Sequence, residues 1–156
     1  MSTGPLVIRE DDLLDSRTRD LVRMHLEGMN AYSPPGSVFA LDFTGLTSPG
    51  VTVWTVWFDD AIAGIGALKK LGDGSGELKS MRTHPDFLRR GVASILLEHI
   101  IGVARAQGMK RVSLETGSGP HFDPALSLYR RRGFIDGDAF SDYQRSAFNQ
   151  FLHLVL

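Results

Sequence analysis

The stretch that decides the fold is FLRRGVASILLEHI, from Phe87 to Ile100. Two arginines, Arg89 and Arg90, stand directly before Gly91, and the residues after this glycine follow the spacing of an amphipathic helix. The first turn of a helix has backbone N–H groups without helical partners and carries the positive end of the helix dipole. Glycine at this place lets a ligand approach the backbone closely. The pattern therefore predicts that N–H groups from Arg89 through Ser94 bind an anion.

A second group of cations, Arg130 to Arg132, also lies beside an expected helix and a glycine. Either group by itself could be a solvated helix end. Two such groups favour one shared polyanionic ligand. General binding of nucleic acid fits poorly, because the formal net charge of the chain is −1.

Hydrophobic periodicity and turn residues divide the chain into alternating strands and helices. The expected strands are residues 6–9, 51–58, 61–71, 77–83, 110–116 and 148–156. The expected helices run from Asp11 or Asp12 to about Glu27, from Val92 to just before Gly108, and from Asp123 to just before Gly133. Residues 30–50 are rich in Pro, Gly and Ser and are expected to be largely loop. The sequence predicts an α/β (α+β) domain with a mixed sheet of about six to seven strands flanked by helices.

Composition narrows the class of protein. With 156 residues, of which 42% are hydrophobic, the chain fits one ordinary globular domain. No apolar run approaches the roughly 20 residues of a membrane helix, and the start, MSTGPLVIRE, lacks the order of a secretory signal, so we expect a cytoplasmic protein. The chain has no cysteine and its histidines are scattered, so no thiolate chemistry and no metal site are expected. No G-x-S-x-G motif indicates a serine nucleophile.

Two stretches carry a family resemblance. GELKSMRTHPDFLRRGVASILLEHIIGVARAQGMKRVSLET, residues 76–116, resembles the cofactor-binding core of the GCN5-related N-acetyltransferase (GNAT) superfamily. ALSLYRRRGF, residues 125–134, resembles the helix that follows it there, and the end of the chain is similar to a bacterial branch of small acetyltransferases. The resemblance implies one N-acetyltransferase domain over residues 1–156. Within it, residues 1–50 would face the substrate and residues 77–134 would bind acetyl-CoA.

The resemblance also implies how acetyl-CoA is held as cosubstrate. The family's pyrophosphate loop falls on Leu88–Ala93, with leucine in place of the family's arginine or glutamine. Main-chain groups of Met81 and Thr83 would pair with the pantetheine arm, and the Met81 N–H would polarise the thioester carbonyl. The family often carries an asparagine where this chain has Phe122. The cofactor-binding residues implied in this way are Met81, Thr83, Arg89, Arg90, Gly91, Val92, Ala93, Ser94 and Tyr129.

Three side chains are candidates for the chemistry of acetyl transfer. Tyr129 is implied to protonate the departing thiolate, since a phenol has a pKa near 10 and a free thiol one near 8.5. Glu77 stands where many family members carry a carboxylate that takes the proton of the amine, and Glu115 is the alternative base. Without cysteine or a nucleophile elbow, direct attack of the amine in a ternary complex is favoured over a covalent acyl-enzyme.

The expected acceptor is the primary amine of a small molecule. The segment after the first helix is expected to line its pocket, where His25, Tyr32 and Ser37 either contact the acceptor or are ordinary packing and surface residues. A protein or peptide amine is the alternative acceptor. A non-catalytic acyl-CoA-binding regulatory domain is the alternative function, motivated by the two departures from the family pattern. No nucleic-acid or membrane partner is expected, and a homodimer is left open.

Overall fold

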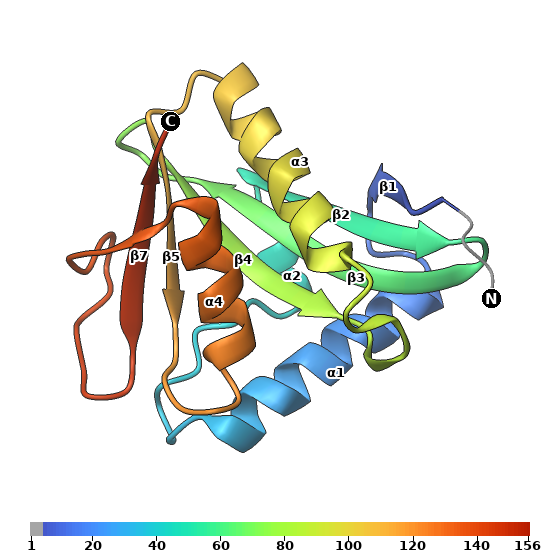
Figure 1. Cartoon of the computed structure of the whole chain (residues 1–156), viewed down its shortest axis with the longest axis horizontal. Helices are drawn as coiled ribbons and strands as arrows, with labels where there is room; N and C mark the ends of the chain where they lie inside the picture. Colours follow the sequence, from blue (N-terminus) through green and yellow to red (C-terminus); the bar gives the residue numbers. More distant parts are fainter. Residues whose placement is uncertain (1–4) are drawn as a thin grey trace.

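Seven strands form one mixed sheet at the centre of the protein, of which the computed structural model describes residues 5–156 (Figure 1). The strands are β1 (Val7–Glu10), β2 (Val51–Phe58), β3 (Ala61–Lys70), β4 (Gly76–Thr83), β5 (Arg111–Thr116), β6 (Ile135–Asp136) and β7 (Gln150–Val155). The helices are α1 (Ser16–Tyr32), α2 (Phe43–Leu46), the short 3-10 helix η1 (Pro85–Phe87), α3 (Val92–Ala106) and α4 (Asp123–Arg132). The order of strands is β1-β2-β3-β4-β5-β7-β6, which confirms the predicted mixed sheet with flanking helices.

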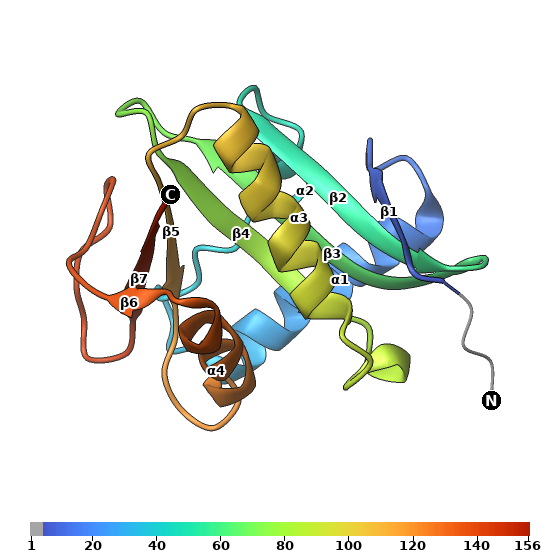
Figure 2. The same cartoon turned by 45° about the horizontal axis from the view of Figure 1, so that its top comes forward.

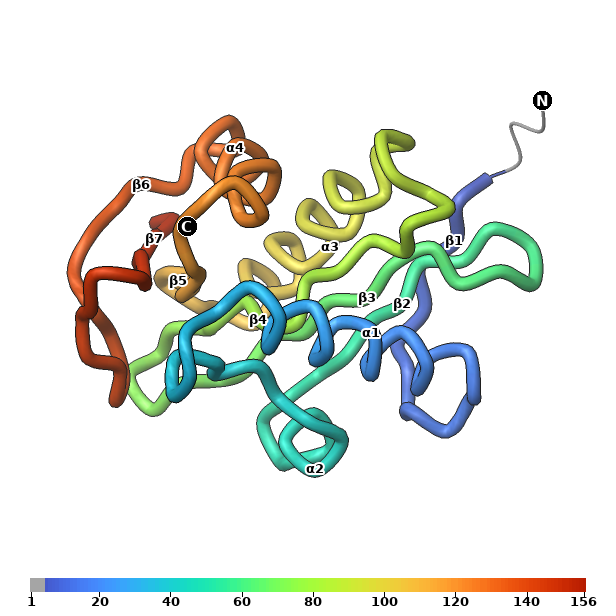
Figure 3. The backbone as a smooth tube through the Cα atoms, turned by 90° about the horizontal axis from the view of Figure 1, so that it is seen from below, coloured from blue at the N-terminus to red at the C-terminus, as the bar shows by residue number. Residues whose placement is uncertain are grey.

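The helices cover the two faces of the sheet. α3 and α4 lie on one face, and α1 and α2 lie on the other (Figures 2 and 3). Leu96 and Ile100 of α3 are buried in a cluster that includes Leu78 of β4. On the opposite face, Leu21 of α1 is buried in a cluster with Ile65 of β3. Burying one such side chain stabilises a fold by about 1.5–3 kcal/mol, so these two cores hold the helices to the sheet.

β4 changes its pairing along its length, and this change opens the sheet. On one side it is antiparallel to β3, with a shift of register next to Ser80, whose φ is 58°. Such a bulge places one extra residue in the strand and bends it. On the other side β4 is parallel to β5, and within residues 5–156 the pairing involves only Gly76 and Glu77 of β4. Beyond them the two strands diverge, as Figure 1 shows.

The first helix begins and ends later than the sequence predicts. Its N-cap is Asp15, which accepts a hydrogen bond in the first turn, rather than Asp11 or Asp12. Asp11 is engaged before the helix, where it accepts a backbone hydrogen bond from Leu13 at 2.8 Å and helps to turn the chain. α1 then continues to Tyr32, past its predicted end near residue 27. The extension brings Tyr32 against His121, on which its ring stacks.

Three short elements are absent from the sequence-based description, one of which is η1, directly after β4. α2 lies within the expected loop, and its N-cap Asp42 accepts a hydrogen bond from the Gly45 N–H at 2.9 Å. β6 consists of two residues that pair with β7. Elements of two to four residues carry no periodic pattern that a sequence reading could detect. α2 is instead held by packing, since Leu46 is only 2% exposed.

Candidate active site

A cavity of about 730 Å³ opens where β4 and β5 diverge. Its wall includes Gly91 and Tyr129 from the side of α3 and α4, and His25 and Phe39 from the side of α1. The cavity therefore passes through the gap in the sheet and joins its two faces. This volume is typical of small-ligand sites. An opening that is reached from both faces can hold two ligands that meet in the gap.

The first turn of α3 forms one end of the cavity. Gly91 is its N-cap residue with a φ of 78°, and no side chain caps the helix. Val92, Ala93 and Ser94 line the cavity, and backbone N–H groups of a first turn have no helical acceptors. A β-carbon added at Gly91 would meet no other atom within 4 Å, so the space in front of the turn is open. These residues fit the pyrophosphate of coenzyme A.

The two arginines before Gly91 are placed differently. Arg89 lines the cavity and has a φ of 62°. Arg90 does not contribute to the cavity wall, and its guanidinium carbon lies 5.4 Å from the centre of the Phe87 ring. Arg131 of α4 does line the cavity. Besides Arg89, the cation available to an anion here is therefore Arg131, from the arginine cluster of α4. The sequence pattern links this cluster to the same anionic ligand as Arg89 and Arg90, but it does not say which arginine makes the contact.

Backbone and side-chain groups of β4 form the middle of the cavity. Met81 and Thr83 line it, as does Ser80 at the bulge. The Ser80 hydroxyl is buried and has no hydrogen-bond partner within the described residues. Because β5 turns away beyond Glu77, this edge of β4 is left for another chain of amides to pair with. The pantetheine arm of coenzyme A has such amides.

The two departures from the family pattern also lie at the cavity. Leu88 lines it and is 58% exposed, so this position offers an apolar contact where the family has a polar side chain. Phe122 lines it from a buried position, with its ring centre 5.5 Å from that of Phe148. Neither side chain blocks the turn at Gly91. The backbone part of the anion site is intact beside them.

α4 carries Tyr129 to the cavity wall. The residue is 6% exposed, and its ring centre lies 5.7 Å from that of Phe134. Among residues 5–156 its hydroxyl group has no hydrogen-bond partner. Burial raises the pKa of Tyr129 above its ordinary value of 10.0. The phenol is therefore protonated at physiological pH and can donate a hydrogen bond or a proton to a ligand in the cavity.

Glu77 is held in a buried polar cluster beside the cavity. It is 2% exposed, and its Oε2 accepts hydrogen bonds from Tyr143 Oη at 2.5 Å and from Lys79 Nζ at 3.1 Å. Lys79 Nζ also donates to Tyr143 Oη at 2.8 Å. Lys79 lines the cavity, whereas Glu77 does not. The Glu77 carboxylate is thus paired with the Lys79 ammonium, and it does not reach an acetyl acceptor in the cavity directly.

Replacing Glu77 by glutamine should therefore unfold the protein more easily. The substitution leaves the Lys79 ammonium, with a side chain only 8% exposed, without its carboxylate. Removing one partner of a buried ion pair destabilises by about 3–5 kcal/mol. Urea denaturation of Glu77→Gln should show a loss of this size in the free energy of unfolding. A loss below about 0.5 kcal/mol, the range of ordinary surface substitutions, would contradict the structural role of Glu77.

Glu115 of β5 is the carboxylate that faces the cavity. It lies in the half of β5 that has left β4, and it contributes to the cavity wall. Burial raises its pKa to about 7, the Glu77 carboxylate adds to the rise, and the charge of Lys79 opposes it. A carboxylate with a pKa near neutrality can both accept and release a proton at physiological pH.

The α1 end of the cavity holds a residue that sequence reasoning missed. Arg82 of β4 lines it together with His25, and Arg82 Nε donates to His25 Nδ1 at 3.1 Å. Tyr32 is not part of the cavity wall, but its ring stacks on that of His121, which is, at 3.8 Å between centres. Ser37 is not part of the cavity wall. Arg82 gave no sequence signal, because one arginine in an alternating strand resembles any exposed strand residue.

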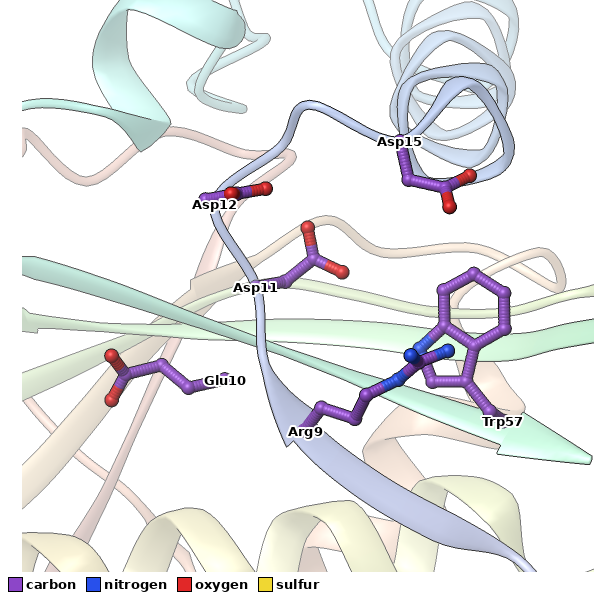
Figure 4. Close-up of a pocket in the computed structure, with 6 residues that line it drawn as sticks. All are labelled: Arg9, Glu10, Asp11, Asp12, Asp15 and Trp57. Carbon is purple, nitrogen blue, oxygen red and sulfur yellow. The ribbon is translucent and has the colours of Figure 1, made fainter.

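A second, smaller hollow of about 420 Å³ lies between β1 and α1 (Figure 4). The residues that line it are Arg9, Glu10, Asp11, Asp12, Asp15 and Trp57. The guanidinium carbon of Arg9 lies 4.0 Å from the centre of the Trp57 ring, and Asp15 caps α1. Within the described chain, no group of three or more His, Asp or Glu side chains is placed to hold a metal ion. Arg9 and Asp15 in this hollow therefore make contacts that stabilise the fold.

A sheet that is split beside an uncapped helix is the arrangement that the resemblance to acetyl-CoA-dependent acyltransferases implies. The chain belongs to the acetyltransferase (GNAT) family, whose pattern matches residues 13–134. Membership confirms the resemblance seen in the sequence. No helix among residues 5–156 is long and apolar enough to cross a membrane.

Relatives at high identity carry the same activity in their names. The chain is 48% identical to the uncharacterized N-acetyltransferase YedL of Escherichia coli K12, over 96% of this chain and 94% of that protein. It is 46% identical to the uncharacterized N-acetyltransferase YsnE of Bacillus subtilis 168, over 87% and 90% of the two chains. Both relatives are bacterial N-acetyltransferases of undefined substrate, as the sequence predicts for this branch.

Solved structures share the fold at low sequence identity. A Klebsiella pneumoniae protein assigned as an acyl-CoA N-acyltransferase superposes with a TM-score of 0.79 at 22% identity, over 97% of each chain. The PaiA N-acetyltransferase of Thermoplasma acidophilum, solved in complex with coenzyme A, superposes with a TM-score of 0.75 at 13% identity, over 97% of this chain and 99% of that one. Identities this low establish the fold alone.

Proposed function

We propose that this protein transfers the acetyl group of acetyl-CoA to the primary amine of a small molecule, by direct attack in a ternary complex. The observation that carries the proposal is the cavity through the sheet, with the first turn of α3 at one end and Glu115 on its wall where β5 has left β4. Acetyl-CoA would lie with its pyrophosphate at Gly91 and its thioester at Met81. The amine would enter from the face of α1.

Each residue has a role in moving the proton or the charge of the reaction. Glu115 takes a proton from the amine as the new C–N bond forms. The Met81 N–H donates a hydrogen bond to the carbonyl oxygen, where negative charge develops. Tyr129 gives its proton to the sulfur as the C–S bond breaks. The amine ends as a neutral amide and coenzyme A leaves as the thiol, while Glu115 is left protonated and Tyr129 is left as a phenolate. Passage of that proton from Glu115 to Tyr129 through solvent restores both side chains and closes the balance.

We assign the base to Glu115 although the sequence favours Glu77. A general base must come within hydrogen-bond reach of the proton that it takes, directly or through one water. Glu115 lines the cavity and Glu77 does not. The Glu77 carboxylate is also engaged by Lys79 and Tyr143. Its role is to hold the ammonium of Lys79, and its negative charge helps to raise the pKa of Glu115.

A small acceptor is favoured over a peptide because the α1 end is partly closed. Phe39 and Ala40 of the segment after α1 line the cavity, and the Phe39 ring lies 5.3 Å from that of Tyr143. His121 also lines the cavity, and the ring of Tyr32 stacks on it. An extended peptide would need an open groove here. A compact amine needs no such groove.

The function is tested by release of coenzyme A thiol from acetyl-CoA in the presence of amines, amino acids and peptides. Turnover on small amines, absent in a Gly91→Glu variant, supports the proposal. Faster turnover on peptides than on free small amines would replace the small-molecule acceptor by a peptide. Binding of acetyl-CoA without transfer to any amine would favour a regulatory acyl-CoA-binding domain instead.

Glu115→Gln should lower the rate of acetyl transfer by about 10²-fold at pH 7, the lower end of the usual worth of a positioned base. The loss should shrink at high pH, because more of the amine is then already unprotonated. In the wild type the rate should rise with pH through about 7, as Glu115 loses its proton, and this step should be absent in the variant. An acceptor amine of low pKa separates this step from ionisation of the acceptor itself.

The same substitution should make the fold more stable at alkaline pH. The pKa of Glu115 is about 7 in the folded protein and 4.5 ordinarily, so folding favours its protonated form. That contribution is present below pH 4.5 and is lost as pH rises through 7. Glu115→Gln should therefore melt at a higher temperature than the wild type at pH 8. An inactive variant that also melts lower would indicate a structural role for Glu115.

A further inference from the structure

Arg82 is a cation at the α1 end of the cavity for which residues 5–156 supply no paired anion. Its Nε donates to His25 Nδ1 at 3.1 Å, and its Nη2 donates to the His25 carbonyl oxygen at 3.3 Å. Both acceptors are electrically neutral groups. Among residues 5–156, no Asp or Glu side chain forms an ion pair with its guanidinium group. Guanidinium groups in half-buried sites are normally paired with carboxylate or phosphate.

The imidazoles near Arg82 remain neutral and do not compete for an anion. Burial, together with the charge of Arg82, lowers the pKa of His25 to about 3. The same two causes lower the pKa of His121. His25 is 6% exposed and acts as an acceptor that fixes the guanidinium plane. The guanidinium is thus oriented by a neutral group, and part of its hydrogen-bonding capacity is left for a ligand.

The backbone around Arg82 is shaped to admit the guanidinium group. The bulge at Ser80 lies two residues before it, and the strand then directs Arg82 toward α1. A β-carbon at Gly28 of α1 would stand 2.6 Å from Arg82 Nη2. Any residue larger than glycine there would push the guanidinium aside. A glycine inside a helix costs up to about 1 kcal/mol relative to alanine, and here it gives room to this cation.

Arg82 is well placed for an acceptor and poorly placed for coenzyme A. The anion site for coenzyme A lies at the first turn of α3, on one face of the sheet. Arg82 contacts His25 of α1, on the opposite face. The other cation near this end, Lys79, is already paired with Glu77. The unpaired positive charge at the α1 end therefore belongs to Arg82.

We infer that the acceptor is an amine that also bears a carboxylate, and that Arg82 binds this carboxylate. The inference rests on the proposed function and names the substrate class of the same site. The carboxylate would receive charge-assisted hydrogen bonds from the guanidinium, and the amine would then face Glu115. A purely cationic acceptor such as a polyamine would instead meet the positive charge of Arg82 without compensation.

The test compares free amino acids with their carboxamides and with the amines that lack the carboxyl group. The series should include α-, β- and γ-amino acids, since the spacing of amine and carboxylate that is preferred reports the distance from Arg82 to the thioester. Rates are compared per unprotonated amine, which removes the difference in amine pKa. The wild type should favour the carboxylate form by about 10²-fold in kcat/KM, as expected for loss of one charged, partly buried contact.

Variants of Arg82 identify the residue responsible. Arg82→Gln should remove the preference, so that amino acids and their carboxamides have similar kcat/KM, and Arg82→Lys should keep part of the preference. Gly28→Ala keeps the arginine but displaces its guanidinium, so it should weaken the preference while raising helix stability. Arg23→Ala, which removes a cation on α1 that pairs with Asp20, is the matched control.

The outcomes separate this inference from the proposed function. Acetylation of carboxamides or polyamines at equal or higher rates, unchanged by Arg82→Gln, would overturn the carboxylate assignment and leave the acetyltransferase intact. Lack of acetylation of every amine would contradict the proposed function itself. Binding is measured independently by titration of amino acids into the Tyr129→Phe variant saturated with coenzyme A. Absence of carboxylate-dependent binding there would also overturn the inference.

Discussion

Gly91→Glu is expected to abolish the binding of acetyl-CoA while the domain remains folded. Gly91 is the N-cap residue of α3 with a φ of 78°, a conformation that costs a residue with a side chain about 1–2 kcal/mol. A β-carbon there meets no atom of the protein within 4 Å, so the fold can accept the larger residue. The new side chain would instead enter the space in front of the helix, and its carboxylate would repel the pyrophosphate.

Isothermal titration with acetyl-CoA measures this loss, with two control variants. Gly91→Ala introduces the backbone strain with little bulk, so it should weaken binding less than Gly91→Glu. Arg89→Ala removes an exposed charge that water and salt already screen, and it should weaken binding by no more than about fivefold. Equal losses from Gly91→Glu and Arg89→Ala would mean that side-chain charge, rather than the backbone of the helix turn, holds the ligand.

Tyr129→Phe is expected to lower kcat by about 10²–10⁴-fold, the usual worth of a positioned acid. The substitution keeps the ring that packs against Phe134 and removes an oxygen that has no hydrogen-bond partner within the described chain. The stability of the fold should therefore hardly change. The KM for acetyl-CoA should also change little, because proton transfer to sulfur belongs to the transition state.

Single-turnover rates are the proper measure for Tyr129, since release of product could limit kcat in the wild type. An unchanged single-turnover rate in Tyr129→Phe would remove the phenol from the mechanism. The pH profile gives a second check. Burial holds the pKa of Tyr129 above 10.0, so its ionisation should not appear as a fall in rate on the alkaline side up to about pH 10.

The parts of the fold that the sequence predicts are the long, strongly periodic ones. Residues 92–106 form the expected helix behind Gly91, and the alternating residues of β2 form the expected strand. The boundaries of α1 could not be predicted, because several acidic residues before it are equally good caps. Asp15 caps the helix, and Asp11 is drawn into a hydrogen bond with the Thr55 hydroxyl, 44 residues away in the sequence, at 2.7 Å.

The candidate site divides in the same way. The sequence pattern predicts the turn at Gly91 as a site and the family resemblance implies Tyr129, and the structure places both residues on the wall of the candidate cavity. Which of Glu77 and Glu115 is free to act as a base depends on which carboxylate is already engaged by buried hydrogen-bond partners. That partner, Tyr143, is 66 residues from Glu77 in the sequence, and no local pattern links them. Likewise, no local pattern links Arg82 to His25 of α1, the residue that orients its guanidinium group.

The short pairing between β4 and β5 also has a consequence for the order of folding. β1 to β4 form one antiparallel unit and β5 to β7 form another, and the two units share only a brief parallel contact. β2, β3 and β4 follow one another through short turns, so their antiparallel pairings are local and form early, whereas the parallel contact of β4 with β5 requires the crossover through α3 to be in place. The parallel contact between the two units is thus weak, and it forms late in folding. A ligand bound between β4 and β5 contacts both units, so its binding free energy stabilises their association.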